Sequence, residues 1–276
     1  MNRFTQPLDQ VRTVAPLVQC ITNFVTVNDC ANLLLAAGAS PTMAQDPREV
    51  EEAVAGVQAL VCNLGAIERT DAMILAGRRA NALGIPVVLD PVAAGGTSLR
   101  RTLSAQLLRE VRFTAIRGNA SEIRSLARQG CGGSGVDVSR GDAVTEENLE
   151  EAVRLVRALA RETGAVIAVS GALDLICDGT RTAVVRNGCP TMARITGSGC
   201  MLTTLIGAFC GASPEEPFEA VCAAMGAMGV CGELAEERRL ANGTGNATFR
   251  TDLIDALFNL TECCLKERVR YELYQR

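Results

Sequence analysis

Histidine and tryptophan are absent from the 276-residue sequence, and lysine occurs only at Lys266. Without histidine, Ser-His and Cys-His nucleophilic devices, imidazole acid–base catalysis and histidine-ligated metals are excluded. The lysine lies in a charged segment near the carboxyl terminus, so a P-loop and a Schiff-base enzyme are effectively excluded too. The remaining chemistry depends on arginine, carboxylates, thiols, hydroxyls, backbone amides and bound metal.

Aromatic residues make up only 3% of the chain and the formal net charge is −4. The sequence therefore offers neither stacking platforms nor a basic surface for nucleic acid. No apolar run of signal-peptide length opens the chain, and no uninterrupted run of about 18 apolar residues predicts a membrane span. We expect a cytoplasmic protein without nucleic-acid or membrane partners.

The twelve cysteines are scattered through apolar segments, and no pair has CxxC spacing. In a long chain without a secretory signal, this pattern indicates small core residues and disfavours a disulfide framework or structural zinc.

Short apolar runs rich in Val and Ile alternate with helical patterns through the middle of the chain. The expected strands are Ala59–Leu64, Ile85–Leu89, Thr114–Ile116 and Ala165–Val169, and the expected helices are Asp71–Leu83, Ser98–Val111, Ala120–Arg128 and Glu146–Thr163. This alternation predicts an α/β fold with a mostly parallel central sheet and helices on both faces. Ligands of such a sheet bind beyond the carboxyl ends of its strands.

The second half of the chain begins with an expected antiparallel hairpin at one sheet edge, Leu173–Cys177 and Thr182–Val185. Helices are then expected at Cys200–Cys210, Pro217–Leu240 and Thr251–Lys266, and the Arg-rich end Lys266–Arg276 is interpreted as a solvated helix face. The Gly-rich stretch Gly130–Gly141 is interpreted as a long loop inside a single domain, residues 1–276.

A glycine turn, Thr196-Gly197-Ser198-Gly199-Cys200, precedes a strongly apolar helical segment. Such a turn exposes backbone amides at the positive end of a helix, which is a phosphate or oxyanion site, although an ordinary helix start has the same pattern. Cys200 would lie in the first turn, where the helix dipole is expected to lower the pKa of a thiol; alternatively it is a packed small residue.

Two strand ends carry charged groups. Asp90 closes the buried run Ile85–Leu89, where parallel-sheet enzymes hold metal-bound water or a substrate hydroxyl; simple N-capping is the alternative. Arg117, Asn119 and Glu122 follow the next strand within about one helical turn. Arg117 suits phosphate and Glu122 suits magnesium through water, whereas Asn119 with Glu122 also matches a capping box.

Six segments in the same order make the chain resemble the hydroxyethylthiazole kinase family of the ribokinase-like superfamily, from near Val18 to about Leu260. The segments are Gln19–Asn23, Gly38–Met43, the segment at Asp90, Arg117–Glu122, Thr196–Cys200 and Asp255–Leu260. The resemblance implies a ribokinase-like kinase that uses ATP and Mg²⁺. Its implied reaction phosphorylates the primary hydroxyl of 4-methyl-5-(2-hydroxyethyl)thiazole, in thiamine biosynthesis or salvage.

The resemblance also implies roles for individual residues and a homotrimer with sites between subunits. In related sugar and pyrimidine kinases, an Asp that acts as a catalytic base occupies the position of Cys200. The resemblance therefore assigns catalysis to the glycine turn, Gly197, Ser198, Gly199 and Cys200. The remaining assignments are substrate contacts by Met43, Gly197, Asn23 and Val27, ATP contacts by Arg117, Ser170 and Asn119, and Mg²⁺ binding by Asp90 and Glu122.

The sequence departs from the family at Ser170-Gly171-Ala172, where the family commonly has Thr-Gly-Glu, and at the stretch Gly130–Gly141. A carboxylate near the nucleotide is therefore missing. Three alternatives remain open: a kinase of the same architecture for another heterocyclic alcohol such as a hydroxymethylpyrimidine, a nucleotide-dependent lyase, and a non-catalytic protein that binds nucleotide or thiazole. The lyase would need an acidic group where Cys200 stands.

Overall fold

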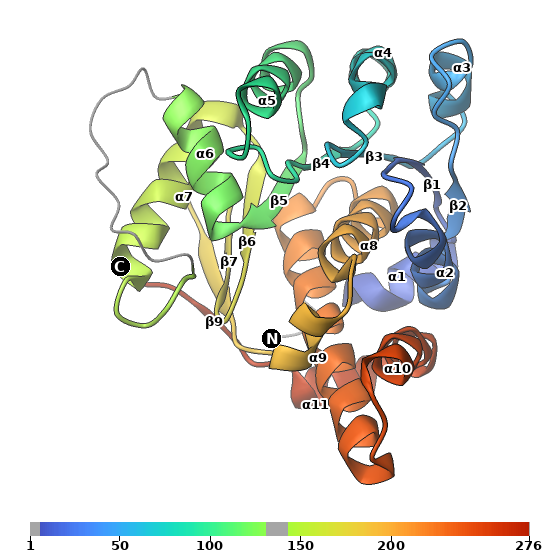
Figure 1. Ribbon diagram of the computed structural model, residues 1–276, viewed down its shortest axis with the longest axis vertical. Coiled ribbons are helices and arrows are strands. Elements are labelled where there is room, and N and C mark those ends of the chain that lie inside the picture. The colour runs from blue at the N-terminus through green and yellow to red at the C-terminus, as the bar shows by residue number, and fades with distance from the viewer. Residues whose placement is uncertain (1–5, 131–142, 276) are drawn as a thin grey trace.

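The structure is a computed structural model that describes residues 6–130 and 143–275. Within these residues the centre is a nine-stranded sheet with the order β2-β1-β3-β4-β5-β6-β7-β8-β9 (Figure 1). The pairs from β2 to β6 are parallel, and those from β6 to β9 are antiparallel. The strands are β1 (Leu17–Ile21), β2 (Ser40–Thr42), β3 (Ala59–Asn63), β4 (Val87–Asp90), β5 (Ala115–Asn119), β6 (Val166–Ser170), β7 (Asp174–Cys177), β8 (Thr182–Val185) and β9 (Tyr271–Leu273).

Helices cover both faces of the sheet and form two apolar cores. One core contains side chains of α1 (Gln6–Val14), α2 (Val27–Ala37), α8 (Ser198–Ala212), α9 (Pro217–Asn242), α10 (Asn246–Asn259) and α11 (Glu262–Arg268). The other contains side chains of α3 (Val50–Val54), α4 (Thr70–Leu83), α5 (Ser98–Glu110), α6 (Ala120–Gly130) and α7 (Leu149–Thr163). Successive strand residues alternate between these cores, as Val61 and Cys62 do, because side chains of a strand point to opposite faces. The predicted fold class is confirmed.

The predicted strands and helices in the middle of the chain are present with small shifts of their ends. β5 continues to Asn119, so Arg117 lies inside the strand, and α7 begins at Leu149. Gly84 ends α4 in the left-handed conformation with a φ of 72°, which glycine adopts readily. Most described cysteines are buried, and all of them are free thiols. The described residues thus keep the expected alternation of strand and helix.

The carboxyl-terminal segment differs from its prediction. Thr261 caps a new helix by accepting a hydrogen bond from Cys264 N at 3.1 Å, so the predicted helix Thr251–Lys266 is divided between α10 and α11. The interpretation of Lys266–Arg276 as a helix face is wrong, because α11 ends at Arg268 and β9 follows it. β9 pairs with β8, so the hairpin does not form the sheet edge. A three-residue strand held by main-chain pairing leaves no apolar alternation in the sequence.

The first part of the chain contains elements that the sequence patterns did not predict. They are α1, β1, α2, β2 and α3. β2 is an edge strand of three residues, too short for a recognisable period. The predicted loop at Gly130–Gly141 lies, apart from Gly130 at the end of α6, outside the described residues.

Within the described residues, α9 is the one helix long and apolar enough to cross a membrane. In the structure, 89% of its most apolar 18-residue window is buried inside the fold. Such burial is typical of a core helix, which passes the same test of length and composition.

Candidate functional site

The carboxyl ends of the parallel strands bring several polar residues to one edge of the sheet. Asn63 at the end of β3 and Asp90 at the end of β4 are register partners, as are Asn119 at the end of β5 and Ser170 at the end of β6. Asn23 follows β1 at the same edge. This is the edge where open α/β sheets bind ligands.

Asp90 is a buried carboxylate at the centre of this edge. Its Oδ2 accepts hydrogen bonds from Asn63 Nδ2 at 3.0 Å and Thr203 Oγ1 at 2.9 Å. Burial raises the pKa of Asp90 to about 6, although Arg117 opposes this shift. These contacts are made with other elements and not with a following helical turn, so Asp90 does not act as the simple N-cap that was its alternative.

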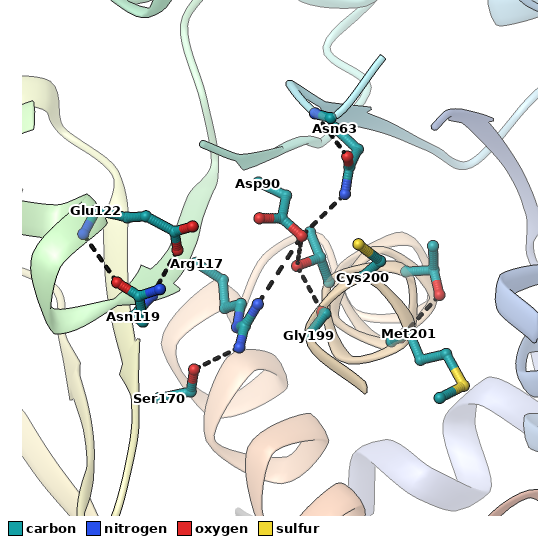
Figure 2. Close-up of polar contacts among 12 residues, drawn as sticks. Asn63, Asp90, Arg117, Asn119, Glu122, Ser170, Gly199, Cys200 and Met201 are labelled. Carbon is teal, nitrogen blue, oxygen red and sulfur yellow. Dashed lines mark hydrogen bonds and ion pairs between the residues drawn. The ribbon is translucent and has the colours of Figure 1, made fainter. Parts of the chain in front are cut away.

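Arg117 of β5 lies beside Asp90 and is itself buried (Figure 2). Its Nη1 is 3.8 Å from Asp90 Oδ2, and its Nη2 donates to the hydroxyl of Ser170. Its Nε is buried and has no hydrogen-bond partner among the described residues. The guanidinium therefore joins the ends of β4, β5 and β6 and supplies a positive charge in a region of low solvent access.

Asn119 and Glu122 form the reciprocal capping box that the sequence suggested (Figure 2). Asn119 Oδ1 accepts from Glu122 N at 2.9 Å, while Glu122 Oε2 accepts from Asn119 N at 2.8 Å. Glu122 Oε1 also accepts from Ala93 N at 2.8 Å, so its carboxylate is fixed on both oxygens. These contacts fix the position of the Glu122 carboxylate. Its negative charge adds to the raised pKa of Asp90.

The glycine turn opens α8 at the same edge. Gly197 has a φ of 84°, and a Cβ on it would lie 3.0 Å from Thr26 Cβ. A Cβ on Gly199 would lie 2.5 Å from Arg117 Nη1. Any side chain at either glycine would push a site residue away, so both positions require glycine. The backbone N–H groups of the first turn, from Ser198 onward, lie at the positive end of α8.

Cys200 lies in this first turn, next to Asn23. The Asn23 amide Nδ2 is 3.4 Å from Cys200 Sγ and 3.2 Å from Asn63 Oδ1, and so links the thiol to the Asp90 cluster. Burial and then the negative charge of Asp90 raise the pKa of Cys200. The expected lowering by the helix dipole is wrong, because desolvation and a nearby carboxylate both disfavour the thiolate.

Two predicted substrate residues do not take part in this polar network. Met43 follows β2 and is partly buried against the apolar core that includes α2 and α8, and Val27 is the first residue of α2. Ser170 joins the network through Arg117. Behind Ser170, the buried Asp174 accepts a hydrogen bond from Gly171 N at 2.9 Å, and burial raises the pKa of Asp174 to about 7.

Asp90 and Glu122 fit a magnesium ion as oxygen ligands. They are close enough for their charges to repel, a repulsion that a divalent cation would relieve. The described residues contain no cluster of three or more metal-ligating side chains. Mg²⁺ does not require one, because it keeps several waters and binds through one or two carboxylates together with substrate phosphates.

Sequence patterns missed four residues of the site: Asn63, Thr203, Asp174 and Thr26. Asn63 is the last but one residue of the predicted strand Ala59–Leu64 and the last residue of β3, so the strand-end rule that found Asp90 could have found it. Thr203 follows Gly199 at the helical i+4 spacing, and its Oγ1 lies within hydrogen-bond distance of Asp90 Oδ2, at 2.9 Å, and of Gly199 O, at 3.1 Å. Thr26 contacts Gly197, which is far away in the chain, and Asp174 accepts from Gly171 at the start of a hairpin that the sequence patterns did not connect with the site.

Solved structures share this architecture. The pyridoxal kinase from Staphylococcus aureus in complex with AMP-PCP and pyridoxal aligns with a TM-score of 0.57 at 14% identity, covering 79% of this chain and 87% of that chain. A hydroxyethylthiazole kinase protein from Pyrococcus horikoshii OT3 aligns with a TM-score of 0.87 at 35% identity over 100% of both chains. The fold is therefore ribokinase-like, the class of small-molecule kinases.

Sequence similarity is equally extensive. The hydroxyethylthiazole kinase of Clostridium acetobutylicum is 46% identical over 269 residues, 97% of this chain and 98% of that protein. The enzyme of Desulfovibrio desulfuricans is 48% identical over 277 aligned positions, covering 97% of each chain. The profile of the Hydroxyethylthiazole kinase family matches residues 8–263. The chain belongs to the hydroxyethylthiazole kinase family, as the resemblance predicted.

Proposed function

We propose that this protein transfers the γ-phosphoryl group of ATP to the primary hydroxyl of 4-methyl-5-(2-hydroxyethyl)thiazole, as one kinase domain in thiamine biosynthesis or salvage. The observation that carries the proposal is the contact of Arg117 with both Asp90 and the glycine turn of α8, in a chain of this family. That contact combines a fixed cation, a carboxylate and a helix amino terminus at one edge of the sheet. Phosphate groups are bound by such an arrangement.

The nucleotide would lie over the ends of β4, β5 and β6. Arg117, Ser170 and Asn119 would contact ATP, and the amides of Gly197 to Cys200 would hold the transferred phosphoryl group. Mg²⁺, held by Asp90 and Glu122 through waters, would neutralise charge on the phosphates. Phosphoryl transfer passes through a loose transition state, so positioning and electrostatic stabilisation do most of the work.

The alcohol would lie beside Cys200, with Asn23, Val27, Met43 and Gly197 around the thiazole. Because the pKa of Cys200 is raised from an ordinary value that already lies above neutrality, its thiol stays protonated at neutral pH. We infer that Cys200 orients the hydroxyl and does not act as a strong base. In a loose transition state the attacking hydroxyl has formed little of its bond to phosphorus and has lost little of its proton, so no strong base is needed.

Substrate-dependent ADP release tests the proposal. The purified protein is incubated with ATP, Mg²⁺ and the thiazole alcohol, and parallel reactions contain hydroxymethylpyrimidine or no alcohol. ADP release that requires the thiazole is the expected result. Turnover of the pyrimidine alone would assign the same chemistry to another substrate, and binding of ATP or thiazole with no ADP release would indicate a non-catalytic binding protein.

We also propose a cytoplasmic homotrimer with sites between subunits. Exposed apolar side chains support an interface near the alcohol side: Phe24 is 86% exposed directly after Asn23, and Leu35 and Phe258 line a groove between α2 and α10. A charged residue at Phe24 should then separate the subunits in light scattering and reduce activity. A trimer that is unchanged by Phe24→Asp and Phe258→Asp would place the interface elsewhere.

A further inference from the structure

Gln19 is a polar residue inside the apolar interior. It lies in the middle of β1, between Leu17 and Ile21, and its exposed fraction is 0%. Its Nε2 donates to the carbonyl oxygen of Ala44 at 2.9 Å, whereas its Oε1 is buried without a hydrogen-bond partner among the described residues. A buried amide with one unsatisfied oxygen costs free energy that an apolar side chain of similar size would not.

The hydrogen bond from Gln19 fixes the chain directly after the edge strand β2. β2 has three residues and pairs with β1, where Thr42 is the register partner of Gln19. The next residues, 43–46, have no regular secondary structure. Met43 is thus held between a strand pair on one side and the clamped carbonyl of Ala44 on the other.

We propose that Gln19 is a positioning residue for the alcohol substrate. Its amide holds Ala44 and thereby fixes Met43 at the carboxyl edge of the sheet. The inference rests on the proposed function, in which Met43 contacts the thiazole. The inference explains why this buried position has an amide whose oxygen has no hydrogen-bond partner in the described part of the chain. If the residue only stabilised the fold, an apolar side chain would give a more stable protein.

Gln19→Met tests the inference, because methionine has a similar shape and cannot donate to Ala44. We expect the KM for the thiazole to rise about fivefold, the size expected for one neutral hydrogen bond. The kcat and the KM for ATP should stay within about twofold, and the melting temperature should be unchanged or higher, because the unsatisfied oxygen is removed as well.

Gln58→Met is the matched control. Gln58 Oε1 accepts a hydrogen bond from Leu17 N at 2.8 Å, at the opposite end of β1. This variant should lower the melting temperature slightly and leave the thiazole KM unchanged. Gln19→Asn supplies a second variant, since its shorter amide cannot reach Ala44, and it should raise the thiazole KM as Gln19→Met does.

A double-mutant cycle shows whether Gln19 acts through Met43. In a Met43→Ala background, Gln19→Met should have little further effect on the thiazole KM. If Gln19→Met leaves the thiazole KM unchanged, or lowers stability and impairs both substrates alike, the positioning role is refuted while the kinase function stands. A wild-type protein that does not phosphorylate the thiazole would refute the proposed function, and this inference with it.

Discussion

The two halves of the site differ in their chemistry. The half around Asp90 and Arg117 consists of buried charges in contact with each other. The half around Asn23 and Cys200 consists of neutral groups, and its contacts are weak, such as the amide to thiol distance of 3.4 Å. Charges buried in a low dielectric interact strongly, whereas neutral groups contribute by shape and by single hydrogen bonds.

This contrast predicts a division of labour. If the first half binds the nucleotide and the second binds the alcohol, substitutions in the nucleotide half should reduce the chemical step. Substitutions in the alcohol half should act more on substrate affinity and orientation. Loss of Mg²⁺ should resemble a substitution in the nucleotide half, because the ion acts on the same phosphate charge.

Arg117→Ala should have the largest effect. It removes the guanidinium that contacts both Asp90 and Ser170, and we expect kcat/KM to fall by about 10²–10³-fold. Steady-state ADP release measures the change, with melting temperature as a check on folding. Arg78→Ala, at an exposed arginine paired with Glu110, is the control and should keep full activity. Comparable losses in both variants would contradict the assignment of Arg117.

Gly199→Ala should have the second largest effect. Its Cβ would lie 2.5 Å from Arg117 Nη1, so the guanidinium must move, and we expect a loss of about 10- to 100-fold in kcat/KM. Gly245→Ala is a suitable control, because a Cβ there meets no atom within 4 Å. A fully active Gly199→Ala enzyme would show that the position of Arg117 is not critical and would weaken the comparison.

Cys200→Ser should have a smaller effect on catalysis. A hydroxyl is somewhat smaller than a thiol but can still donate and accept a hydrogen bond as the protonated thiol does, so we expect at most about a tenfold loss in kcat/KM. The same assay with both substrates varied separates the thiazole KM from kcat. A loss as complete as that of Arg117→Ala would mean that the thiol acts in the chemical step, and the two halves would then not differ as proposed.

Asp174→Asn should change the pH dependence of stability. The pKa of Asp174 is raised to about 7 by burial, well above the ordinary value of about 3.9. The folded protein therefore retains a proton that the unfolded chain releases. This proton therefore stabilises the fold fully below about pH 4, and the stabilisation is lost as the pH rises through about 7. Above that pH, titration of Asp174 no longer changes the free energy of unfolding.

Melting temperatures at pH 5 and pH 8 measure this effect in the wild type and in Asp174→Asn. The asparagine can still accept from Gly171 N but cannot titrate, so the difference between the two pH values should be smaller in the variant. The carboxyl of Asp90, whose pKa is raised to about 6, has the same sign of effect and remains in both proteins. Equal differences would show that Asp174 does not titrate in this range.

Much of the fold and part of the site were predictable because their signals are local. Apolar runs of β3, β4 and β6 lie between helical patterns, and the charged residues that follow such runs must gather at one edge of a parallel sheet. The same rule predicted the positions of Asp90 and of the segment Arg117–Glu122. β9 was missed because its pairing with β8 depends on residues far apart in the chain.

Predictions failed where the property depends on surroundings in space. The helix dipole at Cys200 is a local effect and was the basis for expecting a lowered pKa. Burial and Asp90, which is distant in sequence, decide the opposite direction. Gln19 likewise belongs to a recognisable motif, but its contact with Ala44 and its unsatisfied oxygen exist only in the folded chain.

The sequence by itself determined which chemistry is available, the alternation of strands and helices, and the glycine turn before α8, because composition and periodicity are properties of neighbouring residues. Tertiary structure alone decided that Asn63 and Thr203 hold Asp90, that Arg117 packs on Gly199, and that the thiol of Cys200 keeps its proton. The physical reason is that hydrogen-bond partners, close contacts and pKa values depend on distance and solvent access, which arise only when remote strands and helices pack together.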